Sequence, residues 1–158
     1  LSQAGETDQA ISTAQQALHQ EDLEHTRDQK AELHLVTGRL LRKSGHLDQA
    51  VHHLHQAKKL AQDSHQAYLE LGCLHHDRRQ HDQALEYLLK AIELESEDAR
   101  AYYHAGRVLK DLREFSRAEN MLRRASKLAP NDLRIHRQLG VLVTLNLVHG
   151  DSKVEAYG

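Results

Sequence analysis

Histidine is the residue type most able to do chemistry in this 158-residue sequence, with 14 copies. Asp48, His52 and His55 are spaced at i, i+4 and i+7, so one face of a helix could present three metal ligands. No His-Glu-x-x-His motif occurs, and no residue that would orient the three side chains can be identified. Because a metal site is defined by ligand count and geometry, we expect no metal and no other cofactor.

The same histidines predict a response to acid. Imidazole has a pKa near ~6.5, and protonation of every histidine would move the formal charge from −2 to +12. We expect weaker binding of any cationic ligand and lower stability below about that pH. Most histidines are read as surface residues. The remaining ones are expected to replace aromatic side chains between packed helices, and these are His34, His75 and His136.

Cys73 is the single cysteine, and His76 lies three residues after it. This spacing allows thiolate chemistry, but no third group orients the pair, and a lone helical cysteine is ordinarily a small packing residue. The sequence also lacks a Gly-x-Ser-x-Gly motif, a phosphate-binding glycine loop and a dinucleotide fingerprint. We therefore expect no enzyme. One cysteine excludes an internal disulfide framework and favours the cytoplasm, with the periplasm as the alternative.

The composition favours a chain that is nearly all helix. Hydrophobic residues make up 39% and aromatic residues 4%, with one proline and eight glycines. The formal charge of −2 argues against extensive binding to nucleic acid or to an anionic membrane. The longest nearly apolar stretch, Leu139–Val148, is about half the ~20 residues that a membrane span needs.

A unit of 34 residues repeats along the chain, and residues 65–98 show it most clearly. Apolar residues at helical spacing fall into two groups separated by the polar stretch Asp77–Asp82, which predicts two amphipathic helices joined by a tight turn. Shifts of 34 residues find the same residue types again. The matching positions are Gly38, Gly72, Gly106 and Gly140; Ala50, Ala84 and Ala118; Ala57, Ala91 and Ala125; and Leu54, Leu88 and Leu122.

The motif inside each unit resembles the tetratricopeptide repeat. Tyr68-x2-Leu71-Gly72-x2-His75 has the spacing of large residue, Leu-Gly and second large residue that marks this family, and Ala84 follows at the expected place. The unit that begins at residue 99 matches equally well, and its closing proline is Pro130. The resemblance implies an all-α, right-handed α-solenoid of antiparallel helix-turn-helix repeats, with a concave wall.

We expect one repeat array over residues 1–158. Its units are a partial repeat at 1–30, full repeats at 31–64, 65–98 and 99–132, and a terminal first helix that starts a truncated repeat at 133–158. The pairs Asp63-Ser64, Glu97-Asp98 and Asn131-Asp132 should cap first helices, while Asp8, Asp48, Asp82 and Ser116 suit the starts of second helices. Six extra residues around 25–30 are expected to lengthen a helix, and Gly150-Asp151 to form a turn.

In the family that this chain resembles, the first helix of each repeat lines the groove, and its groove positions carry over to this chain. The four expected first helices place eight Lys or Arg and three Asp or Glu there, a net charge of about +5. Such a wall attracts anionic ligands. The residues expected to bind a peptide are Arg39, Arg42, Lys43, Leu69, Cys73, His76, Arg100, Tyr103, Arg107, Lys110, Arg134 and Arg137.

We expect a protein-binding scaffold whose partner is an acidic, extended peptide or the C-terminus of a partner protein. Members that clamp the terminal carboxylate of a heat-shock chaperone use Lys and Asn, and the fifth and ninth helix positions here hold no Asn, so that clamp is not expected. One alternative is a structural or self-associating segment that forms a homodimer through residues 133–148, an apolar helix. Another is binding to a nucleic-acid backbone, which a single groove aromatic, Tyr103, disfavours.

Overall fold

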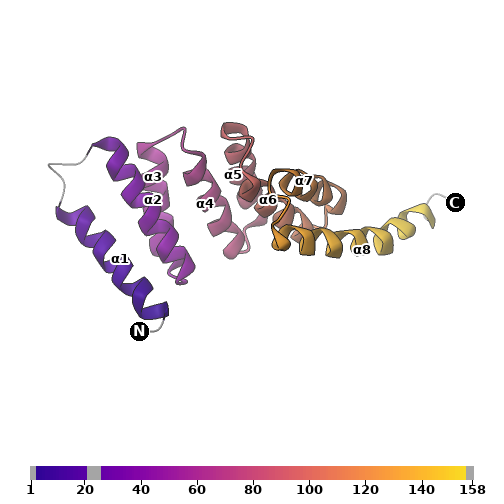
Figure 1. Ribbon diagram of the computed structural model, residues 1–158, viewed down its shortest axis with the longest axis horizontal. Coiled ribbons are helices and arrows are strands. Elements are labelled where there is room, and N and C mark those ends of the chain that lie inside the picture. The colour runs from indigo at the N-terminus through magenta and orange to yellow at the C-terminus, as the bar shows by residue number, and fades with distance from the viewer. Residues whose placement is uncertain (1–2, 21–25, 156–158) are drawn as a thin grey trace.

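The computed structural model describes residues 3–20 and 26–155, which form helices and no strand. The helices stand side by side in chain order, with α1 and α8 at opposite ends (Figure 1). The architecture confirms the predicted all-α, right-handed solenoid. Its elements are α1 (Gln3–Gln20), α2 (Arg27–Lys43), α3 (Leu47–Leu60), α4 (His65–Asp77), α5 (His81–Leu94), α6 (Ala99–Asp111), α7 (Phe115–Leu128) and α8 (Leu133–Glu155).

Each helix pair α2/α3, α4/α5 and α6/α7 packs closely because its first helix carries a glycine at the crossing. A Cβ atom on Gly38, Gly72 or Gly106 would lie only 2.6, 2.5 and 2.6 Å from a leucine side chain of the second helix. The facing leucines, Leu54, Leu88 and Leu122, are fully buried. The repeated glycine and leucine positions therefore define the contact that builds one repeat.

The first helices begin as predicted. Ser64 accepts a hydrogen bond from the Ala67 N–H at 3.4 Å, and Asp98 and Asp132 accept from the N–H groups of Arg100 and Arg134 at 2.9 and 3.0 Å. These side chains satisfy backbone donors that the first helical turn leaves unpaired.

The prediction for the second helices is wrong at their starts. The N-cap residues of α3, α5 and α7 are His46, Gln80 and Glu114, and none of them makes a side-chain cap bond. The preceding residue takes a left-handed conformation, with φ of 84° at Gly45, 62° at Arg79 and 64° at Arg113, so the next helix starts earlier than expected. As a result Asp48, Asp82 and Ser116 lie inside the first turn, and Asp8 lies within α1.

The helix expected to continue through residues 25–30 is interrupted at Thr26. Thr26 is extended and forms a capping box, in which its hydroxyl accepts from the Gln29 N–H and the Gln29 side chain accepts from the Thr26 N–H. This reciprocal pair favours a new helix start over continuation. Arg27–Lys30 do lengthen α2 by one turn. His25 lies outside the described residues.

The last helix, α8, is longer than predicted, because the chain stays helical through Gly150 and Asp151 to Glu155. Ile135 and Leu142 are buried against the rest of the array, whereas Leu133, Leu147 and Val148 are 77%, 66% and 62% exposed. A Cβ atom on Gly140 would meet no atom within 4 Å, since no second helix covers this position in the described chain. No described helix is long and apolar enough to cross a membrane.

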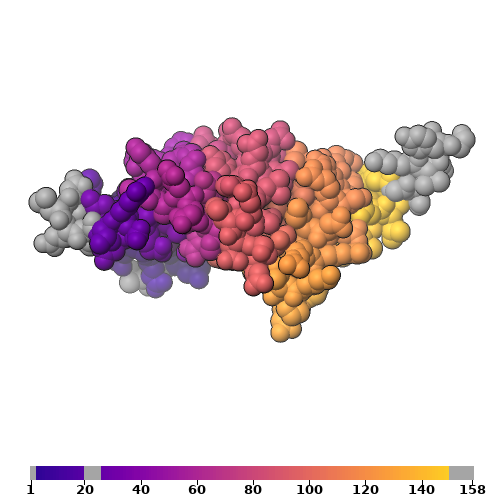
Figure 2. Space-filling model, turned by 90° about the horizontal axis from the view of Figure 1, so that it is seen from above, coloured from indigo at the N-terminus to yellow at the C-terminus, as the bar shows by residue number. Residues whose placement is uncertain are grey.

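The first helices form one continuous wall. α2 contacts α4, α4 contacts α6 and α6 contacts α8, whereas the described second helices α3, α5 and α7 do not contact one another in this way. The first helices of successive repeats are thus closer together than the second helices are. This places the first helices on the inner, concave side of the curve. The space-filling view shows the repeats following one another along an elongated body (Figure 2). We call the α2, α4, α6 and α8 surface the first-helix wall.

Candidate functional site

Two predicted ligand contacts are part of the protein core. Leu69 and Cys73 are 3% and 4% exposed and pack with Ala101, Ala105 and Val108. The close approach of α4 to α6 covers the fifth and ninth positions of α4, so these side chains are not available to a ligand. Burial raises the pKa of the Cys73 thiol to about 12, which removes it as a nucleophile at neutral pH.

The N-terminal half of the wall is neutralised by ion pairs within the protein. Arg39 donates from Nε to Glu70 Oε1 at 2.7 Å, and Arg42 lies 3.3 Å from Glu70 Oε2 and 2.9 Å from Asp77 Oδ2. Glu70 is only 6% exposed. Glu70 is the sixth residue of α4, a position outside the expected groove set, and its charge reduces the net positive charge of the wall. Lys43 is exposed beside this cluster.

The polar contacts follow the repeat. Arg42 reaches Asp77 on the next first helix, and the equivalent His76 reaches Asp111 with Nε2 to Oδ2 at 2.6 Å. The third equivalent residue, Lys110, donates to Gln138 at 2.7 Å. Each contact joins one repeat to the following one, so these residues also support the stacking of the array.

The C-terminal half of the wall keeps more free positive charge. The guanidinium groups of Arg107 and Arg134 lie 5.7 and 5.6 Å from the centre of the Tyr103 ring, within the range of a cation–π contact. Arg107, Lys110 and Arg137 have no carboxylate partner among the described residues. We call Tyr103, Arg107 and Lys110 of α6, together with Arg137 on the adjacent helix α8, the basic cluster.

The other two predicted arginines of this region form ion pairs with the aspartates that cap their own helices. Arg100 pairs with Asp98 at 2.9 Å, and Arg134 pairs with Asp132 at 2.7 Å. The hydrogen bonds from Arg134 lower the pKa of Asp132 to about 2, so this carboxylate stays ionised. Both arginine side chains are more than half exposed, but Asp98 and Asp132 are only 10% and 23% exposed, so an arginine that turned to a ligand would leave a largely covered carboxylate with fewer partners.

His104 lies behind the basic cluster and is neutral at physiological pH. Burial, followed by the charges of Arg107, Arg42, His76 and Arg134, lowers its pKa to about 3. Its ring meets the ring of Tyr103 edge to face, with centroids 5.1 Å apart. His104 occupies the same helix position as Glu70, one repeat later, so the 34-residue spacing could have identified it.

The remaining histidines divide between core and surface. His75 stacks on Tyr87 with ring centroids 5.1 Å apart, which confirms its predicted aromatic role. His34 is partly buried and its Nδ1 lies 3.0 Å from that of His53. The prediction is wrong for His136, which is exposed and bonds to the Pro130 carbonyl.

The three residues that helix spacing could place on one face do not come together as ligands. Among the described residues, Asp48, His52 and His55 form no group that could hold a metal. Asp48 instead lies 3.4 Å from Arg78, and His55 meets the Tyr87 ring. A different group does converge, at His76, His81 and Asp111.

Comparisons with solved structures show a shared fold. A crystal structure of MamA matches with a TM-score of 0.73 at 24% identity, over 87% of this chain and 77% of that chain. The first TPR of Spaghetti (RPAP3), bound to the HSP90 peptide SRMEEVD, matches with a TM-score of 0.73 at 18% identity, over 77% of this chain and 97% of that chain. The Arabidopsis OM64 TPR domain matches with a TM-score of 0.71 at 20% identity, over 74% and 97%.

The sequence comparisons identify the family. No curated protein matches this sequence. Two sequence models, both described as tetratricopeptide repeat, match residues 35–99 and 75–140. Together they extend over residues 35–140, which include all of α3 to α7 and parts of α2 and α8, and hence all three glycine and leucine contacts. The chain belongs to the tetratricopeptide repeat family.

Proposed function

We propose that this protein binds an extended, acidic peptide segment or the C-terminus of a partner protein at the basic cluster of its first-helix wall. Tetratricopeptide arrays are helical scaffolds for protein–protein interaction. The observation that carries the proposal is Arg107, which is held over the Tyr103 ring at 5.7 Å and has no carboxylate partner in the described part of the chain.

The arrangement suits a ligand carboxylate. Arg107 and Lys110 are one turn apart on α6, and Arg137 comes from the neighbouring helix α8. A carboxylate placed between these helices would receive charge-assisted hydrogen bonds, which are about twice as strong as neutral ones. The Tyr103 ring offers an apolar surface to the adjoining peptide side chain. Arg39 and Arg42, in contrast, already hold Glu70, and they would have to exchange that partner for a ligand.

One structural neighbour supports this ligand class. The first TPR of Spaghetti (RPAP3) is bound to the peptide SRMEEVD, whose last five residues include three acidic ones. At 18% identity the similarity concerns the fold, so the proposal rests on the basic cluster itself.

The experiment compares two double variants of the protein. Arg107→Glu with Lys110→Glu reverses the cluster, and Lys59→Glu with Lys127→Glu makes the same charge change at exposed positions of second helices. Binding of a fluorescein-labelled, glutamate-rich peptide is measured by anisotropy, beside its glutamine counterpart. We expect the cluster variant to lose at least tenfold in affinity and the control to lose little, since exposed distant charges are screened by salt.

Equal affinity of both variants would contradict the proposal, and so would capture of the same cellular proteins by the native protein and the cluster variant. An oligonucleotide serves as the competing ligand. If the oligonucleotide binds with a steep salt dependence and the acidic peptide does not bind, nucleic-acid backbone binding replaces peptide binding.

A second function is favoured by the exposed apolar face of α8. Leu133, Val141, Val143, Leu147 and Val148 are all at least 44% exposed and lie around the part of α8 that Ile135 and Leu142 do not bury against the array. We propose that this face mediates self-association. Sedimentation should show a dimer that Val143→Asp with Leu147→Asp converts to a monomer, while Leu89→Asp, on α5, does not. A native protein that sediments as a monomer would refute self-association.

A further inference from the structure

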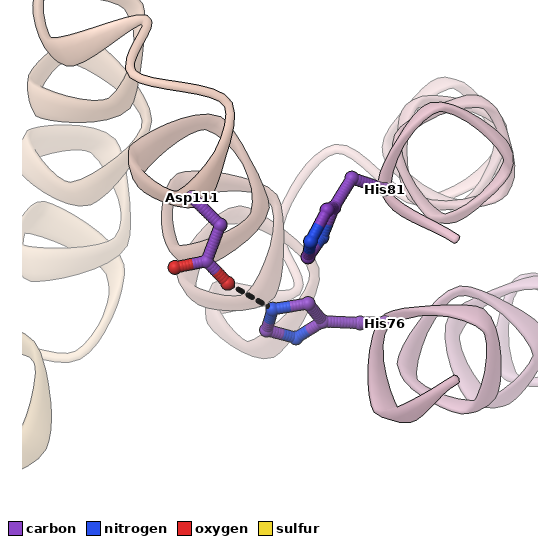
Figure 3. A group of neighbouring side chains, drawn as sticks. All are labelled: His76, His81 and Asp111. Carbon is purple, nitrogen blue, oxygen red and sulfur yellow. Dashed lines mark hydrogen bonds and ion pairs between the residues drawn. The ribbon is translucent and has the colours of Figure 1, made fainter. Parts of the chain in front are cut away.

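We propose that His76, His81 and Asp111 form a binding site for a divalent transition-metal ion of the zinc class. The three side chains come from the end of α4, the start of α5 and the end of α6, and they point toward one another (Figure 3). This site is separate from the peptide ligand proposed above, and it does not depend on that ligand.

The distances fit a site that closes around an ion. Each residue offers a ligand atom, and these atoms all lie within 4.8 Å of one another. A tetrahedral zinc with bonds of ~2.0–2.1 Å needs ligand atoms roughly 3.4 Å apart. His76 Nε2 and Asp111 Oδ2 are closer than this, at 2.6 Å, because they share a hydrogen bond. Asp111 has a side chain that is 35% exposed, so a small rotation would make room for the ion.

His81 supplies the observation that points to a missing partner. Its Nδ1 atom is buried and has no hydrogen-bond partner. A buried polar atom without a partner is destabilising, and native structures contain few of them. The His76 and His81 rings are tilted by 58° with centroids 5.6 Å apart, so the two imidazoles are not stacked on each other. An ion bound between them would give the unpartnered His81 ring a partner and would replace the hydrogen bond between His76 and Asp111 with two metal bonds.

The backbone brings the two histidines together through the turn between α4 and α5. Arg79 has a φ of 62°, and the Arg79 and Gln80 N–H groups donate to the carbonyls of His76 and His75, both at 2.9 Å. This tight turn returns the backbone so that His81, at the first position of α5, faces His76. Asp111 then approaches from the next repeat, at the end of α6.

The neighbouring repeats lack these ligands at the same positions. One repeat earlier the equivalent residues are Arg42, Leu47 and Asp77, and one repeat later they are Lys110, Phe115 and Leu145. The Arg42–Asp77 ion pair shows that this place accommodates a cation next to the carboxylate. In the middle repeat, His76 and His81 replace this guanidinium and the leucine. The place of the positive charge is then open to a metal ion that the two imidazoles can bind.

The local electrostatics and the donor types suggest which ion binds. α4 and α6 both end at the site and bring the partial negative charge of their C-terminal ends, whereas α5 begins there at His81 and brings the partial positive charge of its N-terminal end. Imidazole and carboxylate donors suit Zn²⁺, and Ni²⁺ and Cu²⁺ bind the same donors. With three protein ligands, a tetrahedral ion would take water in its fourth position.

The test is titration of the 158-residue protein with Zn²⁺ by calorimetry. We expect one ion per protein molecule at this site. His81→Ala and Asp111→Asn should each weaken binding by at least about 100-fold, because even loss of a residue that only orients a ligand costs ~10–100-fold. His52→Ala is the matched control, since it removes an exposed histidine of a second helix. Asn at position 111 keeps the size of the side chain and a hydrogen-bonding oxygen.

Two results would overturn the proposal. One is the absence of Zn²⁺ binding by the native protein, and the other is binding that both site variants retain in full. Circular dichroism confirms that each variant is folded, and Co²⁺ absorption in the visible range reports whether the bound ion is tetrahedral. The cluster variant with Arg107→Glu and Lys110→Glu distinguishes the two proposals, because it should lose the peptide and still bind Zn²⁺.

Discussion

At the scale of single residues, His104 shows how the wall controls the charge of a histidine. Its pKa in the folded protein is about 3, below the value of ~6.5 for a free imidazole, because burial and, after it, the charges of Arg107, Arg42 and Arg134 disfavour the protonated form. Burial also lowers the pKa of His53 to about 4, with His34 and His52 adding to the effect. The folded state therefore holds these two histidines neutral where the unfolded state would protonate them.

The first prediction is that the protein loses stability in acid. Between pH 6.5 and about 4 the unfolded state binds protons that the folded state does not, so the unfolding free energy falls as the pH falls. Each of these histidines contributes up to about 1.4 kcal/mol per pH unit in that range. Urea unfolding at pH 7, 6 and 5 measures the slope. His104→Gln should reduce the slope by about that amount, and an unchanged slope would show that the pKa of His104 is the same in the folded and unfolded states.

The sequence predicted the role of a single side chain better than it predicted which residues that side chain contacts. His75 was predicted to replace an aromatic residue, because its place in the motif is normally filled by a large side chain. Glu70, in contrast, looks like an ordinary solvent-facing residue, and its pairing with Arg39 and Arg42 depends on how far α4 is rotated against α2. The His76, His81 and Asp111 group was missed for the same reason, since the approach of Asp111 depends on the packing of α6 against α4.

At the scale of helices, the contact between a glycine and a leucine decides whether two helices form a repeat. A Cβ atom on Gly72 would lie 2.5 Å from Leu88 Cγ and 3.2 Å from the Ala84 carbonyl oxygen. The leucine is fully buried and the carbonyl belongs to the backbone, so neither can move aside easily. Gly140 has the same place in the motif, and a Cβ atom there would meet nothing.

The second prediction follows from this difference. Gly72→Ala should lower the unfolding free energy by about 2–3 kcal/mol, because it overpacks the core. Gly140→Ala should raise it by about 0.5–1 kcal/mol, because alanine is the better helix former and has room. Thermal and urea unfolding of both variants measure these changes. Equal destabilisation by both substitutions would mean that another helix covers Gly140.

The third prediction concerns the turn between the two helices of a repeat. Gly45, Arg79 and Arg113 share the left-handed conformation, which is unfavourable for residues with a Cβ atom. Gly45→Ala should cost about 1 kcal/mol, although a Cβ atom at this position has open space. Arg79→Gly should raise the unfolding free energy by about 0.5 kcal/mol, because the released strain exceeds the entropy cost of glycine. Stability measurements that show no change in either variant would contradict this assignment.

Helix boundaries show where local sequence signals were sufficient. Ser64, Asp98 and Asp132 are the second residues of the three short polar pairs, and they act as N-caps, as predicted. The starts of the second helices were misplaced, because the left-handed turn residue, and not a side-chain cap, ends the turn. Only one of the three turn residues is a glycine, so the sequence gives a weak signal at Arg79 and Arg113.

At the scale of the whole molecule, the repeats are held together only by their neighbours. α1 packs on α2 alone among the described helices, and α8 contacts only α7 and α6. The helices α4, α5 and α6 have neighbours on both sides. In such arrays stability is the sum of each repeat and its adjacent interfaces, so it differs along the array.

The fourth prediction is a gradient of hydrogen exchange. Backbone amides of α4, α5 and α6 should exchange most slowly, because their opening breaks two interfaces, and amides of α1 should exchange fastest. Exchange measured by mass spectrometry on peptides from each helix tests this order. Uniform protection along the array would show that the protein opens as one cooperative unit.

The overall architecture was the part that the sequence predicted best. A period of 34 residues with glycine, alanine and leucine at fixed places allows few folds other than stacked helix pairs. The charge of the groove was predicted less well, because residues such as Arg42 have a helix position typical of ligand binding and in fact join two repeats. The motif of one repeat does not predict an ion pair with a carboxylate of the following repeat.

Glu70 therefore links ligand chemistry to the mechanics of the array. It ties α4 to α2 through two arginines, so a ligand carboxylate that captured Arg39 or Arg42 would compete with this tie. The interface between the first two full repeats would become more flexible as the ligand bound, and the pitch of the superhelix would change there. A ligand held only by Arg107 and Lys110 would leave this interface unchanged, because neither residue bonds Glu70. It would compete instead with the hydrogen bond from Lys110 to Gln138, which joins α6 to α8.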